Sequence, residues 1–211
     1  MYVELKRRCV MGEWAAGTRI SVERIRADYG VSKQPVMEAI RLMSAEGLVD
    51  IVPQVGCIVS AYLPSDVLDF YRLFAATEGT VAETAASRRT EEDLAALNVE
   101  LQGTVRYVDT PATSAEITSY RQANRAFHAT LARATHSPLM VRESARQWDF
   151  SDFLVNTTQA QLAECPGIAG RHNDHIHLVD AILDKNTDRA RGLASRHVEA
   201  LVVLVHGEML S

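Results

Sequence analysis

Three histidines lie on the apolar faces of helices that are predicted for the C-terminal part of the chain. His128 stands between Phe127 and Leu131, and His175 and His197 recur with apolar residues at helical spacing. One such histidine alone is more often a hydrogen-bonded core residue than a ligand. Three imidazoles that converge from three helices would suit a divalent transition metal. The residues by themselves leave both interpretations open.

Two further observations concern the same helices. Asn124 lies one turn before His128, so both side chains project from one face. His172 also faces inward on the predicted helix of His175. The other histidines lie at the periphery of their helices and receive no role: His136, His177 and His206.

The helices that must position these residues follow one another with short connections. Capping residues and Pro or Gly breaks separate the apolar periodic segments, and none of these segments has the pattern of a strand. An antiparallel six-helix bundle is therefore predicted. The expected helices cover residues 65–88, 90–107, 114–134, 137–163, 168–184 and 186–208.

The N-terminal part contains a different pattern, centred on a helix that follows Gly30. Ser32 is a suitable N-cap whose hydroxyl is expected to accept from a free amide, and Gly47 ends the helix. One face is apolar, at Val36, Ile40 and Met43. The side chains on the other face are free to contact another molecule: Lys33, Gln34, Met37 and Arg41.

A hairpin and a shorter helix flank this element. Residues 48–52 and 57–61 are rich in β-branched residues and are separated by a Pro–Gly turn at 53–56. Upstream, Ser21 caps a short helix that ends near Tyr29. With a further helix at the N-terminus, three helices and a hairpin within about sixty residues predict a winged helix-turn-helix. We expect this domain to span residues 1–62 and the helical domain to span 63–211.

Charge and composition limit the possible functions. The chain has 211 residues and a net charge of −5, but residues 1–62 hold eight Lys or Arg against seven Asp or Glu. A nearly neutral DNA-binding domain must gather its basic groups on one face and is expected to double them by forming a homodimer.

The cysteines and the length of the apolar runs indicate the cellular compartment. Cys9, Cys57 and Cys165 are odd in number and widely spaced, which argues against a disulfide framework. No apolar run approaches the ~20 residues of a membrane helix, and no signal-peptide pattern precedes the first helix. We therefore expect a cytoplasmic protein with no membrane segment.

Residues 5–61 resemble the DNA-binding domain of the GntR family of bacterial transcriptional regulators. The matching residues include Val31-Ser32, Pro35-Val36, Glu38-Ala39-Ile40, Leu42, Glu46-Gly47-Leu48-Val49 and Gly56. The family usually has arginine at the positions of Lys33 and Met37, and methionine cannot make the Arg–guanine contact. The resemblance implies double-stranded DNA as a partner, with seven candidate contacts: Ser32, Lys33, Gln34, Met37, Arg41, Gln54 and Gly56.

Residues 65–210 resemble the FCD effector domain of the FadR-type branch, in its six-helix, VanR-like form. Many members bind a cation through one Asp and three His residues, which implies a site here of Asn124, His128, His175 and His197. Asn124 replaces the usual aspartate. An amide oxygen can ligate but brings no charge, so zinc or nickel is expected in preference to a harder ion.

The resemblance also implies a small organic acid as effector. Phe74 stands where the family often has an arginine, which leaves Tyr71, Arg72 and Arg121 as candidate anchors beside the metal. We therefore expect a ligand-responsive regulator, a repressor that binds a pseudo-palindromic operator as a homodimer. The alternatives are a metal-responsive regulator and a metal-dependent enzyme. The second has no support from a nucleophile elbow, a phosphate loop or a Glu beside a zinc-binding His pair.

Overall fold

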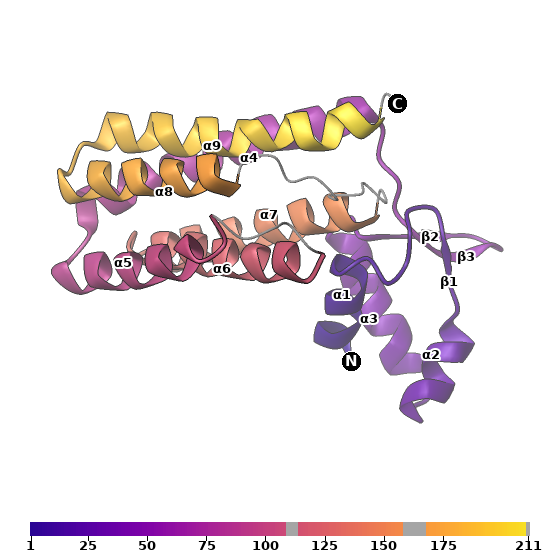
Figure 1. Ribbon diagram of the computed structural model, residues 1–211. Coiled ribbons are helices and arrows are strands. Elements are labelled where there is room, and N and C mark those ends of the chain that lie inside the picture. The colour runs from indigo at the N-terminus through magenta and orange to yellow at the C-terminus, as the bar shows by residue number, and fades with distance from the viewer. Residues whose placement is uncertain (109–113, 158–167, 210–211) are drawn as a thin grey trace. The chain divides into compact units, whose positions relative to one another are not determined.

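The computed structural model describes residues 1–108, 114–157 and 168–209 (Figure 1), with side chains described for 1–108, 117–157 and 168–202. The chain folds into two compact units. The first comprises Met1–Pro64 and Asp149–Ala160, and the second comprises Ser65–Trp148 and Gln161–Ser211.

The first unit is a winged helix-turn-helix. Its elements are α1 (Tyr2–Val10), β1 (Arg19–Ile20), α2 (Val22–Tyr29), α3 (Lys33–Ala45), β2 (Val49–Val52) and β3 (Gly56–Val59). The strands form one antiparallel sheet in the order β1-β3-β2, with Val49 opposite Val59 and Ile20 opposite Cys57. The predicted hairpin is confirmed. β1 was not predicted, because two residues are too few to produce an alternating pattern.

The predicted helix ends are largely confirmed. The hydroxyl of Ser21 accepts from the backbone N–H of Arg24 at 3.2 Å, and α2 ends at Gly30 in the left-handed conformation. Ser32 does occupy the N-cap of α3, but its side chain makes no capping hydrogen bond, so that detail of the prediction is wrong. Gly47, with φ 78°, ends the turn after α3. A Cβ there would lie 2.6 Å from the hydroxyl of Tyr62.

The core of the first unit uses the predicted apolar face of α3. Val36, Ile40 and Met43 are buried, and Ala39 joins them. Cys9 and Cys57 are free and buried in the same unit, whereas Cys165 lies outside the described residues. The C-terminal part of α7 (Pro138–Thr157) also belongs to this unit from Asp149 onward.

The second unit is the predicted bundle. It contains α4 (Pro64–Arg88), α5 (Glu91–Val105), α6 (Ser114–Arg133), the first part of α7, α8 (Ile168–Leu183) and α9 (Thr187–Met209). Thr90 and Asp93 form a reciprocal capping box, and Asn186 Oδ1 accepts from the N–H of Arg189 at 3.1 Å. Residues 158–163, which we expected to continue the fourth helix of the bundle, lie outside the described residues.

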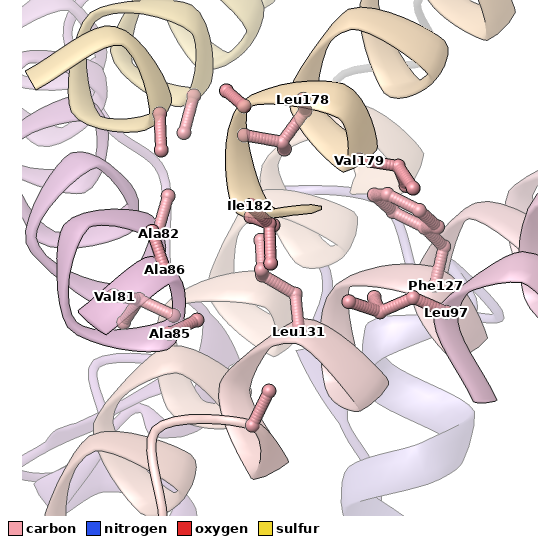
Figure 2. Packing of buried hydrophobic residues seen from close by; sticks show 14 of the residues in the cluster. Val81, Ala82, Ala85, Ala86, Leu97, Phe127, Leu131, Leu178, Val179 and Ile182 are labelled. Atoms are coloured by element: carbon pink, nitrogen blue, oxygen red, sulfur yellow. The ribbon is translucent and has the colours of Figure 1, made fainter. Parts of the chain in front are cut away.

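Packing between the helices of this bundle depends on large residues from some helices and small residues from others. Figure 2 shows Leu97, Phe127, Leu131 and Ile182 meeting in the interior, opposite alanines of α4. Small side chains let α4 and α9 approach closely, since a Cβ at Gly79 would lie 2.3 Å from Ser195 Oγ. Among the described helices, none is long and apolar enough to cross a lipid bilayer.

Candidate metal site and nucleic-acid interface

The three predicted histidines meet inside the second unit. His128 comes from α6, His175 from α8 and His197 from α9, and all three are buried. Each offers one ring nitrogen to a group whose atoms lie within 4.8 Å of one another. The ring centroids of His175 and His197 are 4.6 Å apart, and that of His128 is 5.3 Å from each.

A buried carboxylate fixes the orientation of His128. Glu78 of α4 is fully buried, and its Oε2 lies 3.1 Å from Nδ1 of His128. Ser144 Oγ donates to Oε1 of Glu78 at 2.6 Å, and Trp148 Nε1 donates to Oε2 at 3.1 Å. An ionised carboxylate only accepts, so the proton of His128 belongs on Nδ1 and the lone pair on Nε2. That Nε2 is buried and has no hydrogen-bond partner among the described residues.

A second carboxylate does the same for His197. Asp174 Oδ2 lies 3.1 Å from Nδ1 of His197, which places the lone pair of this ring on Nε2 as well. Arg171 Nη2 donates to that Nε2 at 2.9 Å. The pairing of a carboxylate with the outer nitrogen of a histidine is common in metal sites, where it fixes the tautomer of the ligand.

The third histidine is held by an aromatic neighbour. The ring of His175 stacks on Phe127 with centroids 4.2 Å apart. Its Nε2 lies 3.2 Å from Nε2 of His197. Two nitrogens that each lie 2.0–2.1 Å from a tetrahedral zinc are about 3.3 Å apart, so this separation fits a shared ion. Nδ1 of His175 is buried without a partner among the described residues.

Asn124 is the predicted oxygen ligand. It lies on α6 one turn before His128, it is buried, and its Oδ1 has no hydrogen-bond partner within the described part of the chain. Buried polar atoms are normally paired, so these unpaired acceptors require an explanation. A divalent cation held by the three histidines would satisfy His128 Nε2, and Asn124 Oδ1 is a further unpaired acceptor one helical turn away. The residues that are present therefore fit a metal site.

Electrostatics favour neutral imidazoles in this cluster. Burial lowers the pKa of His128 most, Glu78 opposes this shift, and the positive charges of Arg171 and Arg125 lower the pKa further. Burial, followed by the charges of neighbouring groups, holds the pKa values of His175 and His197 well below the ordinary value. Neutral rings are the form that binds metal.

The other candidates of this domain lie in different surroundings. Tyr71 is fully buried and contacts Phe70 and Phe74, while Arg72 is exposed and pairs with Asp69. Arg121 is half-buried on α6. These contacts of Tyr71 and Arg72 do not involve the histidines. His172 faces inward as expected, and its Nδ1 lies 2.8 Å from the hydroxyl of Thr104.

The residues that orient the histidines were not predicted from the sequence. Glu78, Ser144, Trp148, Asp174 and Arg171 were given no role, although Glu78 interrupts an otherwise apolar face of α4. A glutamate within such a face is a detectable signal, because a buried carboxylate requires partners. Arg171 gave no signal, because a single arginine in a helix is usually a solvated surface residue.

The predicted DNA contacts all belong to the first unit, at α3 and at the wing. Ser32, Lys33, Gln34 and Arg41 are exposed on α3, and Met37 is half-buried. At the wing, Gln54 is exposed with φ 64° and Gly56 is half-buried with φ 114°. Arg19 of β1 was not predicted, yet its guanidinium group lies beside Gly56, where an added Cβ would meet Nε at 3.3 Å.

Ion pairing separates the basic residues of this unit into two groups. Five of the eight Lys and Arg residues of positions 1–62 pair with carboxylates: Lys6, Arg7, Arg8, Arg24 and Arg26. The other three, Arg19, Lys33 and Arg41, have no carboxylate partner among the described residues. Arg19 and Lys33 both lie close enough to act on the thiol of Cys57. The unpaired positive charge is thus concentrated on α3 and the wing, where phosphate contacts are expected.

A winged helix-turn-helix with this basic surface, followed by a helical domain with a buried polar cluster, defines a DNA-binding regulator with a ligand-binding domain. Comparison with known families agrees. Residues 1–59 match the family described as bacterial regulatory proteins, gntR family, and residues 69–200 match the FCD domain. The chain therefore belongs to the GntR family, in the branch that carries an FCD domain. It is a DNA-binding transcriptional regulator and not an enzyme.

Individual relatives are distant. The chain is 26% identical over 136 residues to the uncharacterized HTH-type transcriptional regulator YdhC of Bacillus subtilis (strain 168), a match that covers 64% of this chain and 59% of YdhC. It is 20% identical to the HTH-type transcriptional repressor GlaR of Escherichia coli (strain K12), over 99% of this chain and 95% of GlaR. The solved structure of E. coli McbR/YncC shares the fold, with a TM-score of 0.79 at 17% identity over 98% of this chain and 95% of that one.

Proposed function

We propose that this regulator is a repressor whose affinity for its operator changes when a small organic acid binds beside a divalent cation. The cation would be held by His128, His175, His197 and Asn124, with zinc or nickel as the expected metals. The observation that carries the proposal is the convergence of lone pairs from three buried imidazoles, two of them fixed by carboxylates. A bound cation supplies open coordination positions to which a carboxylate can attach.

The DNA-binding part of the proposal is a homodimer on a pseudo-palindromic operator in the cytoplasm. Two first units would read half-sites about one helical turn apart, with α3 in the major groove and the wing at the backbone. The three unpaired cations of each copy give six in the dimer, which compensates for a domain that is almost neutral. Repression is supported by the name of GlaR, a repressor that this chain resembles over nearly its whole length.

The experiment that tests the metal site replaces His128, His175 and His197 together by alanine. The purified wild-type protein, loaded with zinc and then dialysed, is expected to retain the metal in elemental analysis, and the triple variant is expected to lose it. Circular dichroism and a DNA gel shift show whether the winged-helix unit stays folded. Stoichiometric zinc in the triple variant would contradict the site.

A metal-responsive regulator is the alternative that the same site supports, since three histidine ligands bind tightly without any organic molecule. A gel shift with the operator separates the two. In a metal sensor, zinc alone changes the DNA affinity. In a metabolite sensor, zinc leaves the affinity unchanged until a carboxylate is added, and a thermal-shift screen of carboxylates identifies which one.

A further inference from the structure

Arg171 stands at the candidate metal site without a conventional partner. It lies on α8 one turn before His175 and is half-buried. Its Nη2 donates to Nε2 of His197 at 2.9 Å. Among the described residues it pairs with no carboxylate, although arginines that are partly removed from water usually do.

The nitrogen that Arg171 contacts is the one that a metal would need. Nδ1 of His197 donates to Asp174, so Nε2 carries the only lone pair in the plane of the ring. That lone pair can accept from Arg171 or bind a cation, but it cannot do both. A guanidinium group that stays 2.9 Å from this nitrogen would also repel a dication placed there.

If a cation displaced the guanidinium group of Arg171 from His197, no further described carboxylate that contacts the histidines would be left to pair with it. The described carboxylates that contact these three histidines are Glu78 and Asp174, and both accept from histidine rings. The guanidinium group of Arg171 lies within electrostatic range of His128 and contacts His197. Two carboxylates against this guanidinium group and a dication leave an excess of positive charge, which an anionic ligand would neutralise.

We propose that Arg171 and a divalent cation compete for Nε2 of His197, and that the guanidinium group displaced by the cation binds the carboxylate of the effector. The planar fork of arginine matches a carboxylate in two parallel hydrogen bonds, which a lysine cannot reproduce. Arg171 thereby makes the order of binding matter: the cation comes first and the organic acid second. This inference rests on the proposed function and names the side chain that selects for an acid.

The test compares Arg171→Gln and Arg171→Lys with the wild-type chain. Zinc affinity is measured by competition with a chromophoric chelator, and succinate is then titrated into the zinc-loaded protein in a calorimeter. Arg171→Gln is expected to bind zinc about tenfold more tightly, because the side chain that competes with zinc for Nε2 of His197 no longer makes a charged hydrogen bond. The same variant is expected to bind succinate at least about tenfold more weakly, and Arg171→Lys is expected to bind it weakly as well.

The matched control is Arg189→Met. Arg189 is exposed at the start of α9 and pairs only loosely with Asp184, so its loss changes the net charge without touching the site. It should leave both affinities unchanged. Equal zinc affinities of the wild type and Arg171→Gln, or equal succinate affinities, would overturn this inference while leaving the metal site intact. If neither the wild type nor Arg171→Gln binds zinc, the metal site and this inference are overturned together.

Discussion

Trp148 and Asp149 are consecutive residues of α7, yet their side chains make contacts in different units. Trp148 donates to Glu78, the carboxylate that orients His128. Asp149 accepts a salt bridge from Lys6 at 2.8 Å, and the same ammonium group contacts Glu46 at 2.8 Å. Glu46 is the C-cap residue of α3. One covalent step along α7 therefore connects the surroundings of the candidate metal site with the end of the helix that is expected to read DNA.

This relationship predicts that Asp149→Asn weakens the effect of zinc and succinate on operator affinity more than it lowers the free energy of unfolding. Burial alone would lower the pKa of Lys6, but hydrogen bonds to Asp149 and Glu46 outweigh it and raise the pKa, so the ammonium group stays charged at neutral pH. The side chains are partly exposed, and the loss should cost about 1 kcal/mol or less in urea unfolding. The ratio of operator affinities with and without zinc plus succinate is expected to fall toward one.

Asp28→Asn is the control for this experiment. It removes a carboxylate from an exposed pair on α2 in which Arg24 Nε and Asp28 Oδ2 are 4.0 Å apart. Its operator response should match that of the wild type. A full response in Asp149→Asn would show that α7 does not carry the signal through this salt bridge.

The three unpaired cations of the first unit predict a specific pattern of salt dependence. Alanine at Arg19, Lys33 or Arg41 should weaken binding to the operator and lower the slope of log Kd against log salt by about one for each phosphate that the variant no longer neutralises. Arg7→Ala is the matched control, because Arg7 pairs with Glu4 on exposed α1. Gel shifts at several salt concentrations measure the slope. An unchanged slope for all three variants would place the DNA on another face.

The sequence predicted the elements better than it predicted the contacts between them. Several helix starts follow from local signals: the Ser21 cap of α2 is confirmed, and the starts expected at residues 90 and 186 agree with those of α5 and α9. The three histidines were also predictable, because each lies on an apolar face. Glu78 and Arg171 meet those histidines only through tertiary packing, over separations of 50 and 26 residues. Periodicity within one helix cannot place side chains of two helices together.

The charge of the DNA-binding surface shows the same limit. Residues 1–62 hold eight Lys or Arg against seven Asp or Glu, so composition alone gives little net attraction for DNA phosphates. The structure explains the discrepancy, because intramolecular ion pairs neutralise the basic residues of α1 and α2, while Arg19, Lys33 and Arg41 have no carboxylate partner among the described residues. Which cations are paired depends on distances that composition does not contain.

Glu78→Gln is predicted to weaken metal binding without removing a ligand. The amide keeps the shape of the carboxylate but no longer favours the tautomer of His128 that has its lone pair on Nε2. Loss of such a partner typically costs about 10 to 100-fold in metal affinity, which chelator competition measures. Glu83→Gln, an exposed change on the same helix that affects only the pair with Arg191, should bind zinc like the wild type. Equal affinities in all three proteins would contradict an orienting role for Glu78.

Cys9 is predicted to make stability fall at high pH. Burial raises the pKa of its thiol to about 12, from an ordinary value of 9.0. Between these values the unfolded chain has lost the proton and the folded chain keeps it. The free energy of unfolding therefore decreases as pH rises, by at most about 1.4 kcal/mol per pH unit from this group. Urea unfolding of the wild type and Cys9→Ala at pH 8 and pH 10 isolates the effect, and a pH-independent difference between them would refute it.

Asn124→Asp is predicted to reverse its effect on stability when zinc is added. Without metal, a buried carboxylate beside the histidines lacks a donor in the described surroundings, and the variant should lose about 1–3 kcal/mol relative to the wild type. With zinc, the added negative charge becomes a ligand, so the variant should bind the ion more tightly and gain more in melting temperature. Asn98→Asp adds the same charge at an exposed position of α5, and its zinc affinity should equal that of the wild type. A variant at Asn124 that is destabilised equally with and without zinc would mean that this side chain does not ligate the metal.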